Sequence, residues 1–209
     1  MEGRSALFLG LLSVIGIAVT AQASDVSDHN QRPAFCGDND CPKYQVVNQY
    51  EGFELRQYDA SRWVTTDMEQ DMFGFGMVKS FRRLFKYING SNAEGLNIKM
   101  TVPVLINVPL KTPTVKSSMS FYISNEVENP PQPTDPEVYL ENFPPFSVYV
   151  KPFGGYAVGF IYSSQAKALA KDLKAHDLDF NDAYVVRAGY NDPFTLFNRH
   201  NEVWYIATK

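Results

Sequence analysis

The feature that most constrains the fold is a repeated order of short strand-like runs around one helical stretch. The runs are rich in aromatic and β-branched residues, and they occupy residues 44–50, 53–58, 63–66, 98–108 and 119–123, and then 138–140, 146–150, 156–160, 183–190 and 202–207. A helical pattern interrupts each series, first through residues 78–88 and again from residue 164. We therefore predict an α+β protein in which one antiparallel sheet curls toward a barrel and two helices pack on it. In this duplicated layout, residues 53–58 compare with residues 148–153.

The first residues of the chain predict a secretory signal. A charged start at residues 1–4 precedes an apolar run at residues 6–19, and Ala21 and Ala23 supply the small residues that a signal peptidase reads. Retention as an anchor is the alternative, but the run is shorter than the roughly 20 residues that span a bilayer. We expect a signal peptide at residues 1–23, an irregular polar arm at residues 24–43 and one domain at residues 44–209. The protein would then be secreted, without a stable membrane anchor.

Secretion changes how two further features are interpreted. In an oxidising compartment, Cys36 and Cys41 are expected to form a structural disulfide, since a redox-active pair prefers a shorter spacing. Asn89 begins the triplet Asn-Gly-Ser, which is an acceptor for N-glycosylation where a helix is expected to end.

Composition and motifs exclude several classes of function. The chain has 19 Lys and Arg against 23 Asp and Glu, a net charge of -4, and no basic stripe that would favour nucleic acid. Two Cys and three His are too few for a multi-ligand metal site of the usual spacing. Nucleophile elbows, zinc-binding helices and phosphate loops are missing from the sequence. We therefore predict neither an enzyme nor a metal site made by the protein, and any metal would arrive inside a cofactor.

The first helical stretch carries aromatic residues beside cations. Val78, Phe81 and Phe85 recur at helical spacing together with Ile88, and Arg82 and Lys86 follow the same helix. A tetrapyrrole is a flat apolar ligand with two carboxylates, so it needs an apolar platform and a positive edge. The same pattern also arises in a helix with a buried stripe and a solvated flank, and periodicity alone favours that simpler interpretation.

A family resemblance changes this balance. Residues 81–92, running into Lys-Met-Thr-Val-Pro-Val at 99–104, resemble the helix-to-strand signature of the SOUL family of haem-binding proteins. Later motifs occur in the family's order: Pro-Pro-Gln-Pro at 130–133, Phe-Gly-Gly-Tyr at 153–156, Ala-Gly-Tyr at 188–190 and Arg-His-Asn-Glu-Val-Trp at 199–204. The resemblance covers residues 44–209.

The resemblance implies a distorted antiparallel β-barrel of two similar halves, each with one α-helix, and non-covalent binding of haem or another porphyrin. Carried over by position, the ligand-contacting residues would be Val78, Phe81, Arg82, Phe85 and Lys86, with a loop containing Phe194 and Thr195 closing over them. The chain departs from the family at two positions. Gln57 replaces a histidine that some relatives offer to iron, and Thr195 replaces a lysine of the closing loop.

We therefore predict a monomeric, secreted carrier or scavenger of a tetrapyrrole. The alternative is a secreted protein-interaction module, in which the second helix at residues 164–175 or the proline-rich connector at residues 129–136 binds a protein partner.

Overall fold

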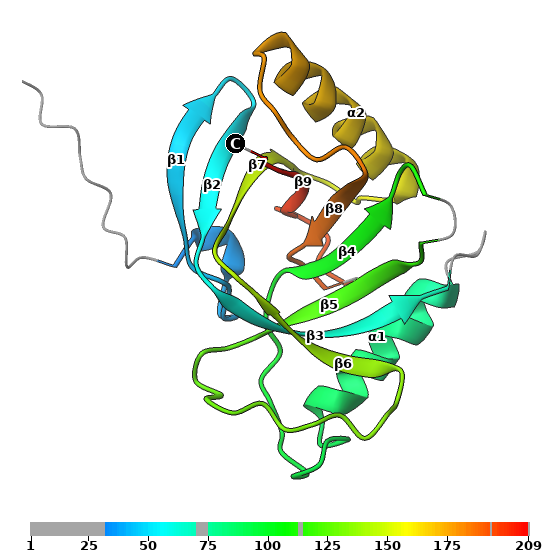
Figure 1. Cartoon of the computed structure of the whole chain (residues 1–209). Helices are drawn as coiled ribbons and strands as arrows, with labels where there is room; N and C mark the ends of the chain where they lie inside the picture. Colours follow the sequence, from blue (N-terminus) through cyan, green and yellow to red (C-terminus); the bar gives the residue numbers. More distant parts are fainter. Residues whose placement is uncertain (1–31, 70–74, 113–114, 193, 209) are drawn as a thin grey trace, which may run out of the picture.

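The computed structural model describes residues 32–69, 75–112, 115–192 and 194–208 (Figure 1). The predicted signal peptide lies outside these ranges, and so does His29, one of the three histidines of the chain. The elements are η1 (a 3-10 helix, Ala34–Cys36), β1 (Tyr44–Tyr50), β2 (Phe53–Tyr58), β3 (Ser61–Met68), α1 (Phe75–Ile88), β4 (Val104–Pro109), β5 (Ser117–Ile123), β6 (Val138–Phe143), β7 (Phe146–Phe153), α2 (Gly159–Ala175), β8 (Tyr184–Gly189) and β9 (Asn201–Ile206).

The strands form one antiparallel sheet in the order β1-β2-β7-β9-β8-β4-β5-β3-β6. On the two sides of the central pair β4 and β8, strand β5 corresponds to β9, β3 to β7 and β2 to β6. The series β2-β3-α1-β4-β5 and β6-β7-α2-β8-β9 therefore occupy equivalent positions in the sheet. The two halves exchange strands, because β2 pairs with β7 and β3 pairs with β6. The sheet curls and carries both helices on its outer side (Figure 1). The predicted α+β architecture of two similar halves with two helices is thus confirmed.

Three details of the prediction are wrong. The strand predicted at residues 98–108 begins only at Val104. Residues 148–153 are not the counterpart of residues 53–58 but their hydrogen-bonded neighbour, with Glu54 opposite Val150. The strand predicted at residues 156–160 is a loop followed by the first residues of α2. Its alternating apolar residues do not mark a buried face, because Tyr156, Val158 and Phe160 are each at least half exposed.

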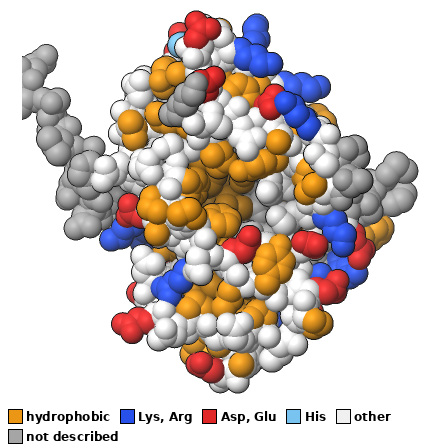
Figure 2. All heavy atoms as spheres, viewed as in Figure 1, with side chains coloured by type: hydrophobic (Ala, Val, Ile, Leu, Met, Phe, Trp, Pro, Cys, Tyr) orange, Lys and Arg blue, Asp and Glu red, His pale blue; other side chains and the backbone are white. Residues whose placement is uncertain are grey.

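Apolar side chains pack on both faces of the sheet. Inside the curl, a cluster contains Tyr58, Trp63 and Trp204, and Figure 2 shows apolar side chains gathered around the hollow at its mouth. On the outer face, α1 packs mainly on β3 and β5, and α2 mainly on β7 and β9. The central strands β4 and β8 therefore lie between the two helices.

The described part of the arm contains the short 3-10 helix η1 and is packed against the domain. Cys36 and Cys41 form the predicted disulfide, with their Cα atoms 6.3 Å apart. Cys36 is buried in the cluster inside the curl. The Val102 N–H donates to the Asp40 carbonyl at 2.9 Å, which fastens the arm to the start of β4.

Candidate functional site

Helix α1 is held on the sheet by one face that combines small and apolar residues. Its buried residues are Gly76, Ser80, Leu84, Tyr87 and Ile88. The small residues near its start let the helix lie close to β3, and Leu84 and Ile88 fill the core beneath it. The Tyr87 hydroxyl donates to the carbonyl of Pro131 at 2.8 Å, which fixes the rotation of the helix.

Because this face is buried, a second apolar stripe of α1 remains open to solvent. Val78 is 47% exposed and Phe85 is 46% exposed, while Phe81 is half-buried. The rings of Phe81 and Phe85 stack with centroids 5.9 Å apart, and Phe81 meets the ring of Phe121 edge-on at 5.1 Å. We call Val78, Phe81 and Phe85 the aromatic shelf. The structure thus brings the predicted apolar contact residues together and leaves them accessible.

The two cations predicted for this site lie beside the aromatic shelf. Arg82 and Lys86 are exposed and one helical turn apart, and neither has a hydrogen-bonded or ion-pair partner within the described residues. We call them the cationic rim. Arg83 differs, because it pairs with Asp135 at 3.5 Å and with Glu137, and so holds the proline-rich connector against α1.

An open hollow of about 710 Å³ runs along the cationic side of α1. Val78, Arg82 and Lys86 line it, together with Phe75, Gly76, Lys79, Arg83, Glu69 and Asp135. Phe81 and Phe85 do not line it but lie on the adjoining flank of the helix. The volume falls within the range of small-molecule sites, and the lining is rich in charge.

The remaining predicted residues lie elsewhere in the fold. Phe194 is 87% exposed in the β8–β9 connection, where its N–H donates to Asp192 Oδ1 at 2.7 Å. The Thr195 hydroxyl donates to Asp192 Oδ2 at 2.6 Å, and neither residue lines the hollow on α1. Asn89 is exposed and donates from Nδ2 to the carbonyl of Phe85 at 2.7 Å. Gln57 lies on β2, in the half of the sheet that α2 covers.

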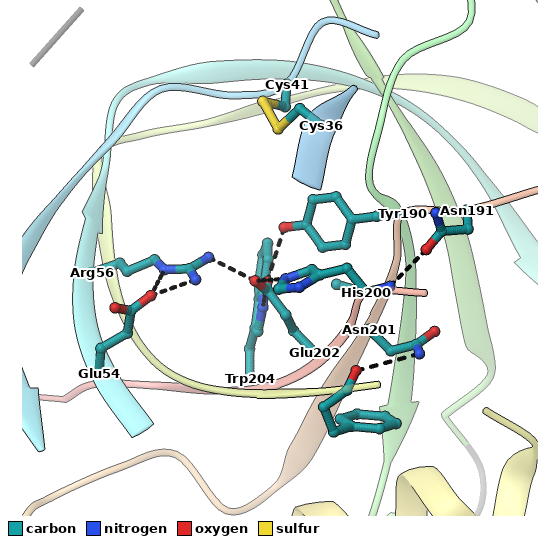
Figure 3. Close-up of polar contacts among 12 residues, drawn as sticks. Cys36, Cys41, Glu54, Arg56, Tyr190, Asn191, His200, Asn201, Glu202 and Trp204 are labelled. Carbon is teal, nitrogen blue, oxygen red and sulfur yellow. Dashed lines mark hydrogen bonds and ion pairs between the residues drawn. A yellow bond between two sulfur atoms is a disulfide. The ribbon is translucent and has the colours of Figure 1, made fainter. Parts of the chain in front are cut away.

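A second polar centre, which the sequence did not reveal, lies inside the curl. Glu202 on β9 is completely buried, and its carboxylate contacts four side chains, three through hydrogen bonds and Arg56 through an ion pair (Figure 3). Oε1 contacts His200 Nε2 at 2.7 Å and Arg56 Nη1 at 3.0 Å. Oε2 accepts from the Tyr190 hydroxyl at 2.9 Å and from Trp204 Nε1 at 2.7 Å. We call these five residues the carboxylate cluster.

The carboxylate cluster is an anchor for the arm and three strands. Burial opposes ionisation of Glu202, but the donors from His200, Arg56 and Trp204 outweigh it and hold the pKa of this carboxyl below its ordinary value. Three hydrogen bonds and the ion pair with Arg56 surround the carboxylate, so the protein's own groups satisfy it. Phe35 of the arm stacks on His200 at 4.0 Å and covers the cluster. Glu202 and Arg56 are far apart in the sequence, and each lies in an ordinary strand pattern.

Metal ligands do not converge in the described residues, which contain no group of three or more His, Cys, Asp or Glu able to hold an ion. The His176 ring packs edge-on against Tyr50 and Phe53, and His200 belongs to the carboxylate cluster. Within the described ranges, neither helix is long and apolar enough to cross a membrane.

Comparison with known proteins agrees with this architecture. The curated relatives include Heme-binding protein 2 of Mus musculus, 34% identical over 74% of this chain and 77% of the relative. They also include Heme-binding protein 1 of Xenopus laevis, 32% identical over 74% of this chain and 83% of the relative. Their names describe binding proteins and not enzymes.

Among solved structures, the C-terminal domain of EcmrR matches 79% of this chain and 98% of its own length with a TM-score of 0.54. At 8% identity, this match concerns the fold alone. The sequence model described as SOUL heme-binding protein matches residues 39–206. The chain therefore belongs to the SOUL heme-binding protein family.

Proposed function

We propose that this protein binds haem or another porphyrin without a covalent bond, on the outer flank of α1. The observation that carries the proposal is the stacked, accessible pair Phe81 and Phe85 beside two cations that have no partner in the described structure. The names of the curated relatives and of the family support the same ligand class.

The arrangement matches the two parts of a porphyrin. The apolar macrocycle would cover the aromatic shelf, which gains free energy because exposed apolar surface leaves water. The two carboxylates of the ligand would pair with Arg82 and Lys86, and both cations can turn toward it because no carboxylate of the described residues holds them. Haem would add iron chemistry to the protein when bound.

Among the described residues, those that line the hollow on α1 include none of the kinds that usually bind haem iron. Its lining contains no His, Cys or Met. We therefore expect the macrocycle and its carboxylates to provide most of the affinity, with the iron exchangeable. Metal-free protoporphyrin should then bind about as tightly as hemin.

A pair of titrations tests this proposal. Purified protein is titrated with hemin, followed by the shift of the Soret band, and separately with protoporphyrin, followed by its fluorescence. We expect saturable binding of both ligands with dissociation constants within about tenfold of each other, since one axial bond is replaced by water at most. A folded protein that shows no saturable response to either ligand at micromolar concentration would refute the proposal.

We further propose that the protein is a secreted, monomeric carrier or scavenger. The support is the charged start, apolar run and small residues of the first 23 residues. Expression of the full chain in secreting cells should release a product that begins at Ser24, as read by mass spectrometry of the medium. A cell-associated product that keeps residues 1–23 would contradict this part of the proposal.

The structure does not favour the alternative of a protein-interaction module. Ala166, Leu169 and Leu173, the buried residues of α2, pack against the sheet and are not free for a partner. The proline-rich connector is held against α1 through Asp135 and the carbonyl of Pro131.

A further inference from the structure

A guanidinium without an acceptor lies between the two helices. Arg187 is on β8, directly opposite Ile106 of β4, on the sheet face that carries the helices. Its Cζ lies 5.5 Å from the centroid of the Tyr162 ring on α2. A Cβ atom added to Gly159, the first residue of α2, would lie 3.9 Å from Nη1 of Arg187. These contacts place the guanidinium beneath the start of α2.

Arg187 is unusual among the half-buried and buried cations of this protein. Its Nε is buried and has no hydrogen-bond partner, and the described residues supply no acceptor or carboxylate to the rest of the group. By contrast, the buried Arg56 pairs with Glu202 at 3.0 Å, and Arg83 pairs with Asp135 and Glu137. Burial lowers the pKa of Arg187, because the charged form is the one that loses water. A partly desolvated cation without a carboxylate partner costs stability, and a bound anion would reduce that cost.

A second arginine, Arg199, acts electrostatically on Tyr162 as Arg187 does, against the opposite effect of the buried Glu202. Arg199 lies over the ring of Tyr156 at 4.5 Å, and its Nε is also buried without a partner. Other nitrogens of Arg199 donate to the carbonyls of Asp192 at 2.8 Å and Thr195 at 2.7 Å, so this residue holds the β8–β9 connection. Both arginines act electrostatically on the Tyr162 hydroxyl. Neither has an ion-pair partner among the residues that the structure describes.

Exposed apolar side chains lie on the two connections near these arginines and on the first turn of α2. They are Tyr156 and Val158 of the β7–α2 connection, Phe160 of α2, and Phe194, Leu196 and Phe197 of the β8–β9 connection, each at least 50% exposed. Asn201 Nδ2 donates to the Gly155 carbonyl at 2.9 Å and so joins the two connections. A ligand that fits both the arginines and the exposed apolar side chains has an anionic end and an apolar body.

We propose that Arg187 is the anion-binding residue of a second site, which takes the carboxylate of an apolar molecule at the start of α2. A long-chain fatty acid and the carboxylate of a porphyrin share this chemistry. The site is built from residues outside α1, so it does not depend on the aromatic shelf.

Three variants test the proposal on the full mature chain. Arg187→Met keeps the volume of the side chain but removes the charge. Gly159→Glu places a carboxylate near Nη1, where it serves as an internal ligand. Lys167→Met removes an exposed cation of α2 away from Arg187 and is the matched control. Each variant is titrated calorimetrically with dodecanoate, with uncharged dodecanol and with hemin, and its thermal midpoint is measured.

We expect dodecanoate to bind the wild type and dodecanol to bind it at least about tenfold more weakly. Arg187→Met and Gly159→Glu should each lose about tenfold or more in dodecanoate affinity. Both variants should melt no lower than the wild type, because a merely structural arginine would lower the midpoint on removal. If the porphyrin is the source of the carboxylate, the same loss appears with hemin and not with dodecanoate. The control should match the wild type in every titration.

Affinities for both ligands that stay within about twofold of the wild type in Arg187→Met would overturn the proposal. So would a wild type that binds neither ligand, or an Arg187→Met protein that melts lower with its affinities unchanged. The proposed porphyrin site on α1 is judged separately, by wild-type hemin binding and its dependence on Phe85.

Discussion

Replacing Phe85 by Ala tests whether the aromatic shelf carries binding energy. The ring is 46% exposed, so of the roughly 200 Å² that a Phe presents, about 90 Å² is left for a ligand to cover. At about 25 cal/mol per Å², that burial is worth roughly 2.3 kcal/mol. An alanine methyl retains a small part of the contact. We therefore expect a loss of about 1.5–2 kcal/mol, which is roughly 10–30-fold in hemin affinity.

The same substitution should leave the fold intact. Phe85 lies outside the core beneath α1, so its removal should change the free energy of unfolding by less than about 1 kcal/mol. Soret titrations give the affinity and urea unfolding gives the stability. Leu110→Ala is the matched control, because Leu110 is 51% exposed and lies away from α1. Hemin affinity within about twofold of the wild type, at unchanged stability, would show that the ring is not a contact.

Three further predictions concern charge, the carboxylate cluster and the arm. Changing both residues of the cationic rim to Glu should weaken hemin binding by about tenfold at low salt and less at high salt, as titrations at two salt concentrations would show. Glu202→Gln removes the Arg56–Glu202 ion pair and leaves the buried Arg56 with Glu54 as its carboxylate partner, so urea unfolding should show a loss of about 1–3 kcal/mol. Since folding lowers the pKa of Glu202, its contribution is full above the unfolded value of about 4.3 and falls as the pH drops through the folded value. Acid unfolding below that pH should therefore cost the wild type more stability than the variant. Replacing Cys36 and Cys41 together by Ser opens a six-residue loop and should cost about 2 kcal/mol in the same assay.

The helix of the candidate site shows how far sequence pattern alone can predict a surface. Apolar spacing predicted the helix correctly, but the core stripe it suggested included Val78 and Phe85, which the structure leaves exposed. The buried face instead uses Gly76 and Ser80, whose small size permits close packing on the sheet. An apolar pattern does not identify Gly76 and Ser80 as buried positions, because neither residue is a large apolar one. The family resemblance implied that Val78, Phe81 and Phe85 contact a ligand, which requires the exposure that Val78 and Phe85 have and that periodicity did not predict.

The carboxylate cluster is a feature that the sequence pattern did not predict. Alternation around Glu202 predicts a strand, and so does the pattern around Arg56, but neither indicates that the two charges meet inside the curl. Their contact depends on β2 and β9 both pairing with β7, which is a property of the exchanged halves. Long-range pairing of this kind requires the topology, and local sequence does not provide it.

The most direct test of the central claim is where a porphyrin touches the protein. Gallium protoporphyrin is diamagnetic, so its ring current shifts the NMR signals of the protons that it covers. We predict that the largest shifts in a saturated complex fall on the methyl groups of Val78 and the ring of Phe85, with smaller shifts along the cationic rim. Shifts that leave α1 unchanged and fall on residues inside the curl would contradict the account.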